Sequence, residues 1–154
     1  MPAGFPPLSI NPGLALSMRC APCIQAAFQP AEDNPLIAIA ATDSRGELVA
    51  IDCAAVQPTL VEIIQTRPRV VRGNHRHWLC SEVLTVVSGV LDIYLLCGCQ
   101  GKHLFCKRME SGASVHLPPG TAHAIHTLAE TTIASVFVDG DPRLDRERIE
   151  IISG

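Results

Sequence analysis

Aromatic residues and charged residues are both scarce in this chain. Phe, Trp and Tyr make up 4% of its 154 residues, which disfavours a pocket built for flat aromatic substrates. Charged residues make up 18%, and the net charge of -3 is spread along the sequence, so there is no basic stripe for nucleic acid and no polybasic patch for a membrane surface. No apolar run reaches the roughly 18 residues of a membrane span, and the N-terminus lacks a basic segment before an apolar signal core. We therefore expect a cytoplasmic protein that binds neither nucleic acid nor membranes.

The seven cysteines do not form the pattern of a secreted disulfide scaffold. Their number is odd, and a chain with 47% hydrophobic residues can build a core without covalent links. Cys20-Ala-Pro-Cys23 has the spacing of a redox or zinc pair, but no second pair of this spacing accompanies it. Cys97-Gly98-Cys99 lies in a predicted hairpin and has a structural interpretation. We therefore expect reduced thiols as the default state.

Short strands separated by turns that contain Gly or Pro dominate the middle of the chain. Leu60–Val71 is predicted as one long strand, with a bulge or an edge position at Pro68. The other predicted strands are Leu36–Ala41, Glu47–Asp52, Glu82–Val87, Val90–Leu96, His103–Glu110, Ser114–Leu117, His123–Leu128 and Thr131–Val138. This pattern predicts an all-β fold, a β-barrel or double-sheet jelly roll that covers residues 36–140.

The two ends of the chain differ from this middle part. Residues 1–35 hold seven of the twelve prolines and show no sustained periodicity, which predicts an irregular Pro-rich arm. Residues 141–154 are rich in charge and are predicted as a tail, either a short helix or an extended arm.

Three histidines and a glutamate form a candidate metal site. His75 and His77 are two residues apart and would therefore point to the same face of a strand. Glu82 returns on the next strand, and His123 arrives from a later hairpin. Imidazole and carboxylate together favour a transition metal over Ca or Mg, so the sequence predicts one divalent ion, with Zn, Fe, Ni and Mn as candidates.

Strand alternation gives a map of the surroundings of this site. If His75 and His77 face the barrel interior, a regular strand also turns inward Gln65, Arg67, Arg69, Val71 and Gly73, and turns outward Arg72, Asn74, Arg76 and Trp78. An inward Arg is costly unless it meets an anion, so Arg67 and Arg69 are candidates for binding a phosphate or a carboxylate, with a salt bridge to Glu62 as the alternative. Arg72 is a third candidate for substrate binding.

Two further residues are candidates for proton transfer. His116 precedes Leu117-Pro118-Pro119-Gly120 and could stand at the mouth of the barrel as a donor or acceptor. Tyr94, the one tyrosine, could serve as a phenolic acid if its strand turns it inward.

Residues 75–89 and 112–123 match both signature motifs of the cupin superfamily, and the resemblance covers about residues 43–140. The stretch Arg72-Gly73-Asn74-His75-Arg76-His77, followed by Glu82 and Ser88-Gly89, resembles the cupin domain of capsular-polysaccharide enzymes that make N-acetylfucosamine nucleotides. Asp43-x-Arg45-Gly46 resembles the opening of dTDP-4-dehydrorhamnose 3,5-epimerases, and the His-containing stretch also resembles sugar 3,4-ketoisomerases. The resemblance implies a cupin barrel, often paired as a homodimer, that moves a proton beside the ketone of a 4-keto sugar nucleotide.

The chain departs from these families in two respects. In metal-free sugar epimerases the first His of the motif is the base, whereas here His75 would be a metal ligand. The ketoisomerases carry an amide where this chain has Glu82, which favours a metallated site.

The same four ligands leave two other classes of function open. Fe, Ni or Mn held in this way could support a dioxygenase or a decarboxylase acting on a small molecule. A metal- or ligand-binding protein without catalysis is the third possibility.

Overall fold

The computed structural model describes residues 7–16, 26–30, 37–52, 57–96 and 103–154, and every element in these ranges is a strand. The strands are β1 (Ser9–Ile10), β2 (Ala15–Leu16), β3 (Ala27–Gln29), β4 (Ile37–Asp43), β5 (Gly46–Ile51), β6 (Leu60–Thr66), β7 (Val71–Arg76), β8 (Ser81–Ser88), β9 (Val90–Leu96), β10 (His103–Glu110), β11 (Ser114–Leu117), β12 (Ala122–Thr127), β13 (Thr131–Val138), β14 (Glu147–Arg148) and β15 (Ile152–Ser153). In the part of the chain that the structure describes, no helix could cross a membrane.

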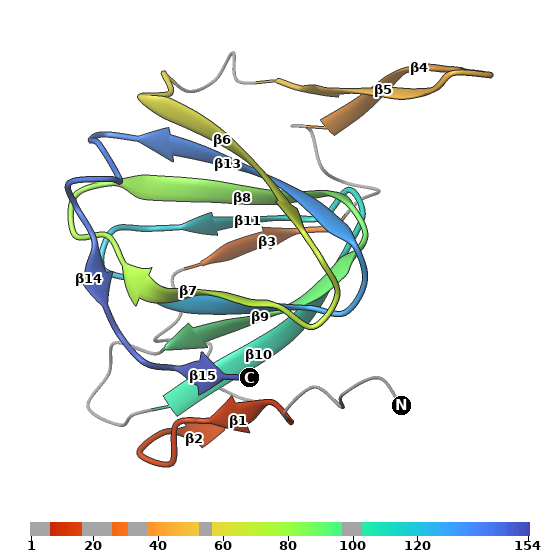
Figure 1. The fold of residues 1–154 in the computed structure, drawn as a ribbon. Coiled ribbons are helices and arrows are strands. Elements are labelled where there is room, and N and C mark those ends of the chain that lie inside the picture. The colour runs from red at the N-terminus through yellow and green to blue at the C-terminus, as the bar shows by residue number, and fades with distance from the viewer. Residues whose placement is uncertain (1–6, 17–25, 31–36, 53–56, 97–102) are drawn as a thin grey trace.

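Two facing sheets form the body of the molecule (Figure 1). A six-stranded sheet has the order β14-β7-β12-β9-β10-β2, and a five-stranded sheet has the order β3-β11-β8-β13-β6. Neighbouring strands are antiparallel, except for the parallel pair β10 and β2. The crossing of the chain between the two sheets is that of a jelly roll, which confirms the predicted all-β class.

Apolar side chains from both sheets meet between them. Each sheet turns one face to this core because side chains alternate along a strand. The fully buried members are Leu84, Val86, Leu91, Ile93, Leu95, Met109, Val115, Leu117, Ile125 and Ile133. This core holds the two sheets together.

The ends of the chain are built into the sheets. In the N-terminal region, β2 joins the six-stranded sheet and β3 joins the five-stranded sheet, so the arm predicted as irregular contains ordered strands. Of the two alternatives for the C-terminal segment, the structure has extended chain and no helix: β14 pairs with β7, and β15 pairs with β1. A second apolar cluster, which includes Tyr94, Ile151 and Ile152, covers the outer face of the six-stranded sheet. The Cys20–Cys23 pair, Cys97 and Cys99 lie outside the described residues.

The segment predicted as one strand over Leu60–Val71 is two strands. A turn at Pro68 and Arg69 separates β6 from β7, and Arg69 has a φ of 61°. The hydroxyl of Thr127 holds this turn, because it donates to the carbonyl of Arg67 over 2.6 Å and accepts from the Val70 amide over 3.0 Å.

The inward and outward faces predicted upstream of His75 are also wrong. A β-bulge lies at Gly73 and Asn74, where φ is 86° and 55°, and the pairing with β12 shifts there by one residue. Beyond the bulge, Arg72 pairs with the inward-facing Ile125, and Val71 pairs with His126 on the outer face. The extra residue at the bulge reverses which side chains of the preceding part of β7 face the barrel interior, so Arg72 points inward.

The β8–β9 hairpin depends on Gly89. Its φ is 95°, and a Cβ added there would lie 2.6 Å from Thr131 Oγ1, 2.8 Å from Thr131 Cα, and closer still to the carbonyl oxygen of Glu130. We expect Gly89→Ala to lower the free energy of unfolding by about 3 kcal/mol, from about 1–2 kcal/mol of backbone strain and a similar cost of overpacking.

Thermal denaturation measures this effect, since about 3 kcal/mol corresponds to about 6–12 °C in a domain of this size. Gly46→Ala is the matched control, because Gly46 also has a positive φ but has no atom within 4 Å of an added Cβ. Equal losses in the two variants would show that the close approach at Gly89 carries no cost.

Candidate metal centre

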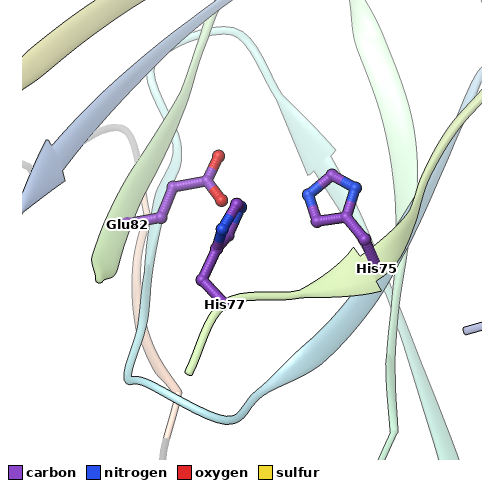
Figure 2. Close-up of side chains that lie close together, drawn as sticks. All are labelled: His75, His77 and Glu82. Carbon is purple, nitrogen blue, oxygen red and sulfur yellow. The ribbon is translucent and has the colours of Figure 1, made fainter. Parts of the chain in front are cut away.

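Two of the predicted ligands come from the end of β7. His75 lies in the strand, and His77 follows directly after its last residue, so both rings reach the same end of the barrel (Figure 2). Their ring centroids are 4.9 Å apart. The bulge at Gly73 and Asn74 fixes this orientation, because Asn74 Oδ1 accepts the amides of Ile151 and Ile152 at 2.9 and 3.1 Å.

Glu82 and His123 complete the group from the two facing sheets. Glu82 lies on β8 of the five-stranded sheet, and His123 lies on β12, paired with His75. Candidate ligand atoms of His75, His77 and Glu82 all lie within 4.8 Å of one another. The fourth residue joins them, since His123 Nε2 is 3.4 Å from Glu82 Oε2 and its ring centroid is 4.7 Å from that of His75.

Burial keeps two imidazoles of this group, those of His75 and His123, neutral. Loss of solvent, and then the other histidines, lower the pKa of His75 to about 3. Loss of solvent lowers the pKa of His123 to about 4. Burial raises the pKa of Glu82, which is 5% exposed. The two neutral rings therefore present free lone pairs at pH 7, which is the state that binds a metal.

Two buried polar atoms of the group have no hydrogen-bond partner. They are His77 Nε2 and Glu82 Oε2. A buried polar atom without a partner costs about 1–3 kcal/mol, so proteins keep few of them. One imidazole nitrogen and one carboxylate oxygen, in a group whose candidate ligand atoms lie within 4.8 Å of one another, fit the donor set of a divalent transition metal.

The outer nitrogen of each ring meets a backbone carbonyl. His77 Nδ1 donates a short hydrogen bond to the carbonyl of Asp145, which leaves Nε2 with a lone pair directed at the group. His123 Nδ1 donates in the same way to the carbonyl of Thr121 at 3.4 Å. Partners of this kind orient metal-binding histidines in proteins.

Asp145 also holds the turn that follows His77. Its carboxylate accepts the backbone amides of Trp78, Leu79 and Cys80 at 3.0, 2.7 and 2.9 Å. Burial would raise the pKa of Asp145, but these three donors outweigh it and lower the pKa to about 2. One residue of the C-terminal segment thus fixes both the ring of His77 and the chain beside it.

Asp145→Ala keeps the backbone carbonyl that meets His77 and removes the carboxylate that holds the turn after it. Because this turn positions His77, we expect metal binding to weaken by about 10- to 100-fold, the usual cost of losing a group that orients a ligand. Titration against a coloured chelator measures the affinity. Asp141→Ala is the matched control, since Asp141 lies in the same loop and pairs with Arg143 at 2.7 Å. An unchanged affinity in Asp145→Ala would show that the carboxylate and the turn it holds do not position His77.

A cavity of about 360 Å³ opens above the histidines. His75, Glu82 and His123 line it together with apolar residues of both sheets, and three charged side chains, Glu62, Arg72 and Arg146, complete its wall. The cavity therefore joins a group of neutral imidazoles to two guanidinium groups and one further carboxylate.

The structure places the other predicted site residues elsewhere. His116 is exposed on β11 and does not line the cavity. Tyr94 is 6% exposed within the apolar cluster on the outer face of the six-stranded sheet, where burial raises its pKa. Arg67 and Arg69 are exposed at the β6–β7 turn, and Arg67 lines a different, open pocket with Gln65 and Glu130. Of the three predicted arginines, only Arg72 lines the cavity with the histidines.

Sequence reasoning missed Asp145 and Arg146. Both belong to the charged segment that was predicted only as a tail, and they reach the site because β14 pairs with β7. A second contact fixes this pairing, since Glu147 accepts from Arg76 Nε at 2.8 Å and from Trp78 Nε1 at 2.6 Å. The density of charge directly after the last long strand was the available signal.

No protein-family model matches the sequence, and no curated protein matches it. Solved structures do match. A 3,4-ketoisomerase from Thermoanaerobacterium thermosaccharolyticum, in complex with TDP-4-keto-6-deoxyglucose, is 15% identical, with a TM-score of 0.61 over 80% of this chain and 86% of that one. The TDP-quinovose 3,4-ketoisomerase WlaRB from Campylobacter jejuni is 20% identical, with a TM-score of 0.59 over 80% and 92%. The RmlC epimerase from Mycobacterium tuberculosis is 17% identical, with a TM-score of 0.60 over 80% and 68%.

These similarities concern the fold, because the identities are 15–20%. They agree with the two signature motifs and with the arrangement of the two sheets. The chain has the cupin fold, in the form that these sugar-nucleotide ketoisomerases and epimerases share.

Proposed function

We propose that this protein is a metal-dependent isomerase or epimerase that moves a proton beside the ketone of a nucleotide-linked keto sugar. The observation that carries the proposal is the set of side chains that line one cavity. His75, Glu82 and His123, which group with His77, line it together with two arginines.

The residues that would hold the metal are His75, His77, Glu82 and His123. The neutral rings of His75 and His123 and the unpartnered atoms His77 Nε2 and Glu82 Oε2 support this assignment. When bound, a divalent ion in such a site acts as a Lewis acid that polarises a carbonyl oxygen and makes the neighbouring C–H more acidic.

Arg72 and Arg146 would bind the anionic part of the substrate. Within the described ranges neither side chain has an ion pair or a hydrogen bond to another side chain, although other arginines of the chain are paired with carboxylates. Guanidinium groups bind phosphate oxygens through two parallel hydrogen bonds. A diphosphate held by these two side chains would place the attached sugar in the cavity next to the histidines.

The comparisons support the same class of substrate. The similar structures named above are ketoisomerases and an epimerase, and one of them holds TDP-4-keto-6-deoxyglucose. The arginine pair favours this class over a dioxygenase or decarboxylase acting on a small molecule, because two guanidinium groups on one wall suit the several anionic oxygens of a diphosphate.

Two measurements test the proposal. TDP or UDP should raise the melting temperature, since a ligand that binds the folded state alone stabilises it by about 2.7 kcal/mol at 100 times its Kd. The metal-loaded protein should also convert TDP-4-keto-6-deoxyglucose, or its UDP counterpart, to an isomer seen by NMR. Absence of both effects, or consumption of O2 with a small acid by the iron-loaded protein, would overturn the proposal.

A further inference from the structure

Glu62 is a carboxylate of the cavity that the proposed function does not yet use. It lies on β6, where side chains alternate between a half-buried face and an exposed face, and it belongs to the half-buried face. Its side chain lines the same cavity as His75, Glu82 and His123. Among the described residues Glu62 has no hydrogen bond or ion pair. It interacts electrostatically with Glu82 and with Arg143.

The other polar residues of the cavity wall are poor candidates for accepting a proton from carbon. His75, Glu82 and His123 are the proposed ligands, and a bound metal occupies their lone pairs. Arg72 and Arg146 carry guanidinium groups, which donate hydrogen bonds and have no acceptor atom. Neither His116 nor Tyr94 lines the cavity. Among the described residues of this wall, Glu62 is thus the one carboxylate that is not a proposed ligand, and a carboxylate can accept and return a proton.

Its position separates Glu62 from the metal ligands. Glu62 pairs with Ser135 on β13, whereas Glu82 on β8 pairs with Phe137 of the same strand. The two carboxylates therefore start from strands that lie two spacings apart, about 10 Å between their backbones. Glu62 is also absent from the group of candidate ligand atoms that lie within 4.8 Å of one another, so it lines the cavity beside that group and is not a member of it.

We propose that Glu62 is the catalytic acid–base residue of the site, an inference that rests on the proposed function. The carboxylate takes the proton from the carbon next to the ketone. The electron pair of that C–H bond becomes the C=C bond of an enediolate, and the ketone oxygen takes the negative charge. The enediolate loses the proton of the neighbouring hydroxyl to water, Glu62 returns its proton to the former ketone carbon, and the oxygen receives a proton from water. The products are an isomeric ketone and the original carboxylate.

A single acid–base group also restricts the reaction. Inversion at one carbon needs a proton removed from one face of the ring and returned to the other face, which calls for two groups. A shift between neighbouring carbons needs one group on one face. We therefore expect a ketone to move along the ring, and not an inverted centre beside an unmoved ketone.

The test compares Glu62→Gln and Glu62→Asp with the wild type in D2O, using TDP-4-keto-6-deoxyglucose and its UDP counterpart as probes. We expect Glu62→Gln to lose about 10²- to 10⁴-fold in the rates of deuterium uptake and of isomer formation, the usual share of a general base. Glu62→Asp keeps the carboxylate and should retain part of the activity. Glu110→Gln, the same change at an exposed residue of β10, is the control and should behave as the wild type.

The outcomes separate this inference from the proposed function. Glu62→Gln must keep its metal content and its stabilisation by TDP. If it keeps both and also keeps its activity within about threefold, or if the product is an inverted 4-keto sugar, the role of Glu62 is overturned while the proposed function stands. Loss of metal in Glu62→Gln would make Glu62 a ligand and would overturn this role as well. A wild type that exchanges no deuterium with either probe overturns both proposals.

Discussion

Glu82→Gln is expected to stabilise the metal-free protein and to remove most of the stabilisation that a metal provides. Glu82 is 5% exposed, and burial raises its pKa. At pH 7 the metal-free protein must bury this group as an anion or protonate it, and either choice costs free energy. Glutamine has nearly the same shape and carries no charge, so we expect a gain of about 1 kcal/mol or more.

With metal bound, the wild type should be more stable than Glu82→Gln. At a concentration 1,000 times its Kd, a metal stabilises the wild type by about 4.1 kcal/mol. That corresponds to about 8–16 °C in the melting temperature of a domain of this size. Removing a charged ligand should weaken binding at least as much as removing an orienting partner does, about 100-fold, so the stabilisation at the same metal concentration falls to about 1.4 kcal/mol.

Thermal denaturation with and without added metal measures both effects. Glu110→Gln again serves as the control, because this residue is exposed and its replacement should change neither melting temperature. A metal-free Glu82→Gln protein that is less stable than the wild type would show that Glu82 makes favourable contacts of its own. It would contradict a role in which the carboxylate is kept for the metal.

The second large effect concerns the two arginines of the cavity. We expect Arg146→Ala and Arg72→Ala each to weaken the binding of TDP by about 10- to 100-fold, because a hydrogen bond to a charged group contributes about 1.5–3 kcal/mol. The double variant should lose TDP binding altogether at accessible concentrations. Isothermal titration calorimetry at low ionic strength gives the three affinities.

Arg108→Ala is the control for this series. Arg108 pairs with Asp92 at 3.0 Å on the β9–β10 hairpin and does not line the cavity. If Arg108→Ala weakens TDP binding as much as Arg146→Ala does, the effect comes from net charge and not from the cavity wall.

The four proposed ligands could be found from the sequence because their spacing follows the strand itself. His75 and His77 lie two residues apart, Glu82 begins the next strand, and the structure brings all three within 4.8 Å. The faces of β8 and β12 were also predictable, since Glu82 and Leu84, and likewise His123 and Ile125, line the cavity from regular strands.

The arginines could not be placed because the irregularities of the backbone were assigned to the wrong positions. Pro68 was the strongest signal for a break, yet it begins a turn in which Arg69 takes a positive φ without a Gly to mark it. The bulge that exchanges the faces lies at Gly73 and Asn74, residue types that tolerate positive φ. One displaced residue turned Arg72 from the outer face to the cavity.

No local sequence pattern indicated that the C-terminal segment contributes to the site. Asp145 contacts His77 across 68 positions of sequence. Such a contact depends on the pairing of β14 with β7, and a two-residue strand gives too short a periodicity to be recognised. The residues that orient the site were therefore visible only in the folded chain.

The content of metal per chain tests the central claim most directly. Mass spectrometry should be applied to wild-type protein purified without a metal-affinity tag, together with His123→Ala and His116→Ala. His123 is 4% exposed within the group, whereas His116 is exposed on β11, so the two variants remove the same side chain from inside and outside the site. We predict close to one divalent transition metal per chain in the wild type and in His116→Ala, and almost none in His123→Ala. No metal in any of the three proteins, or equal metal in all three, would contradict the account.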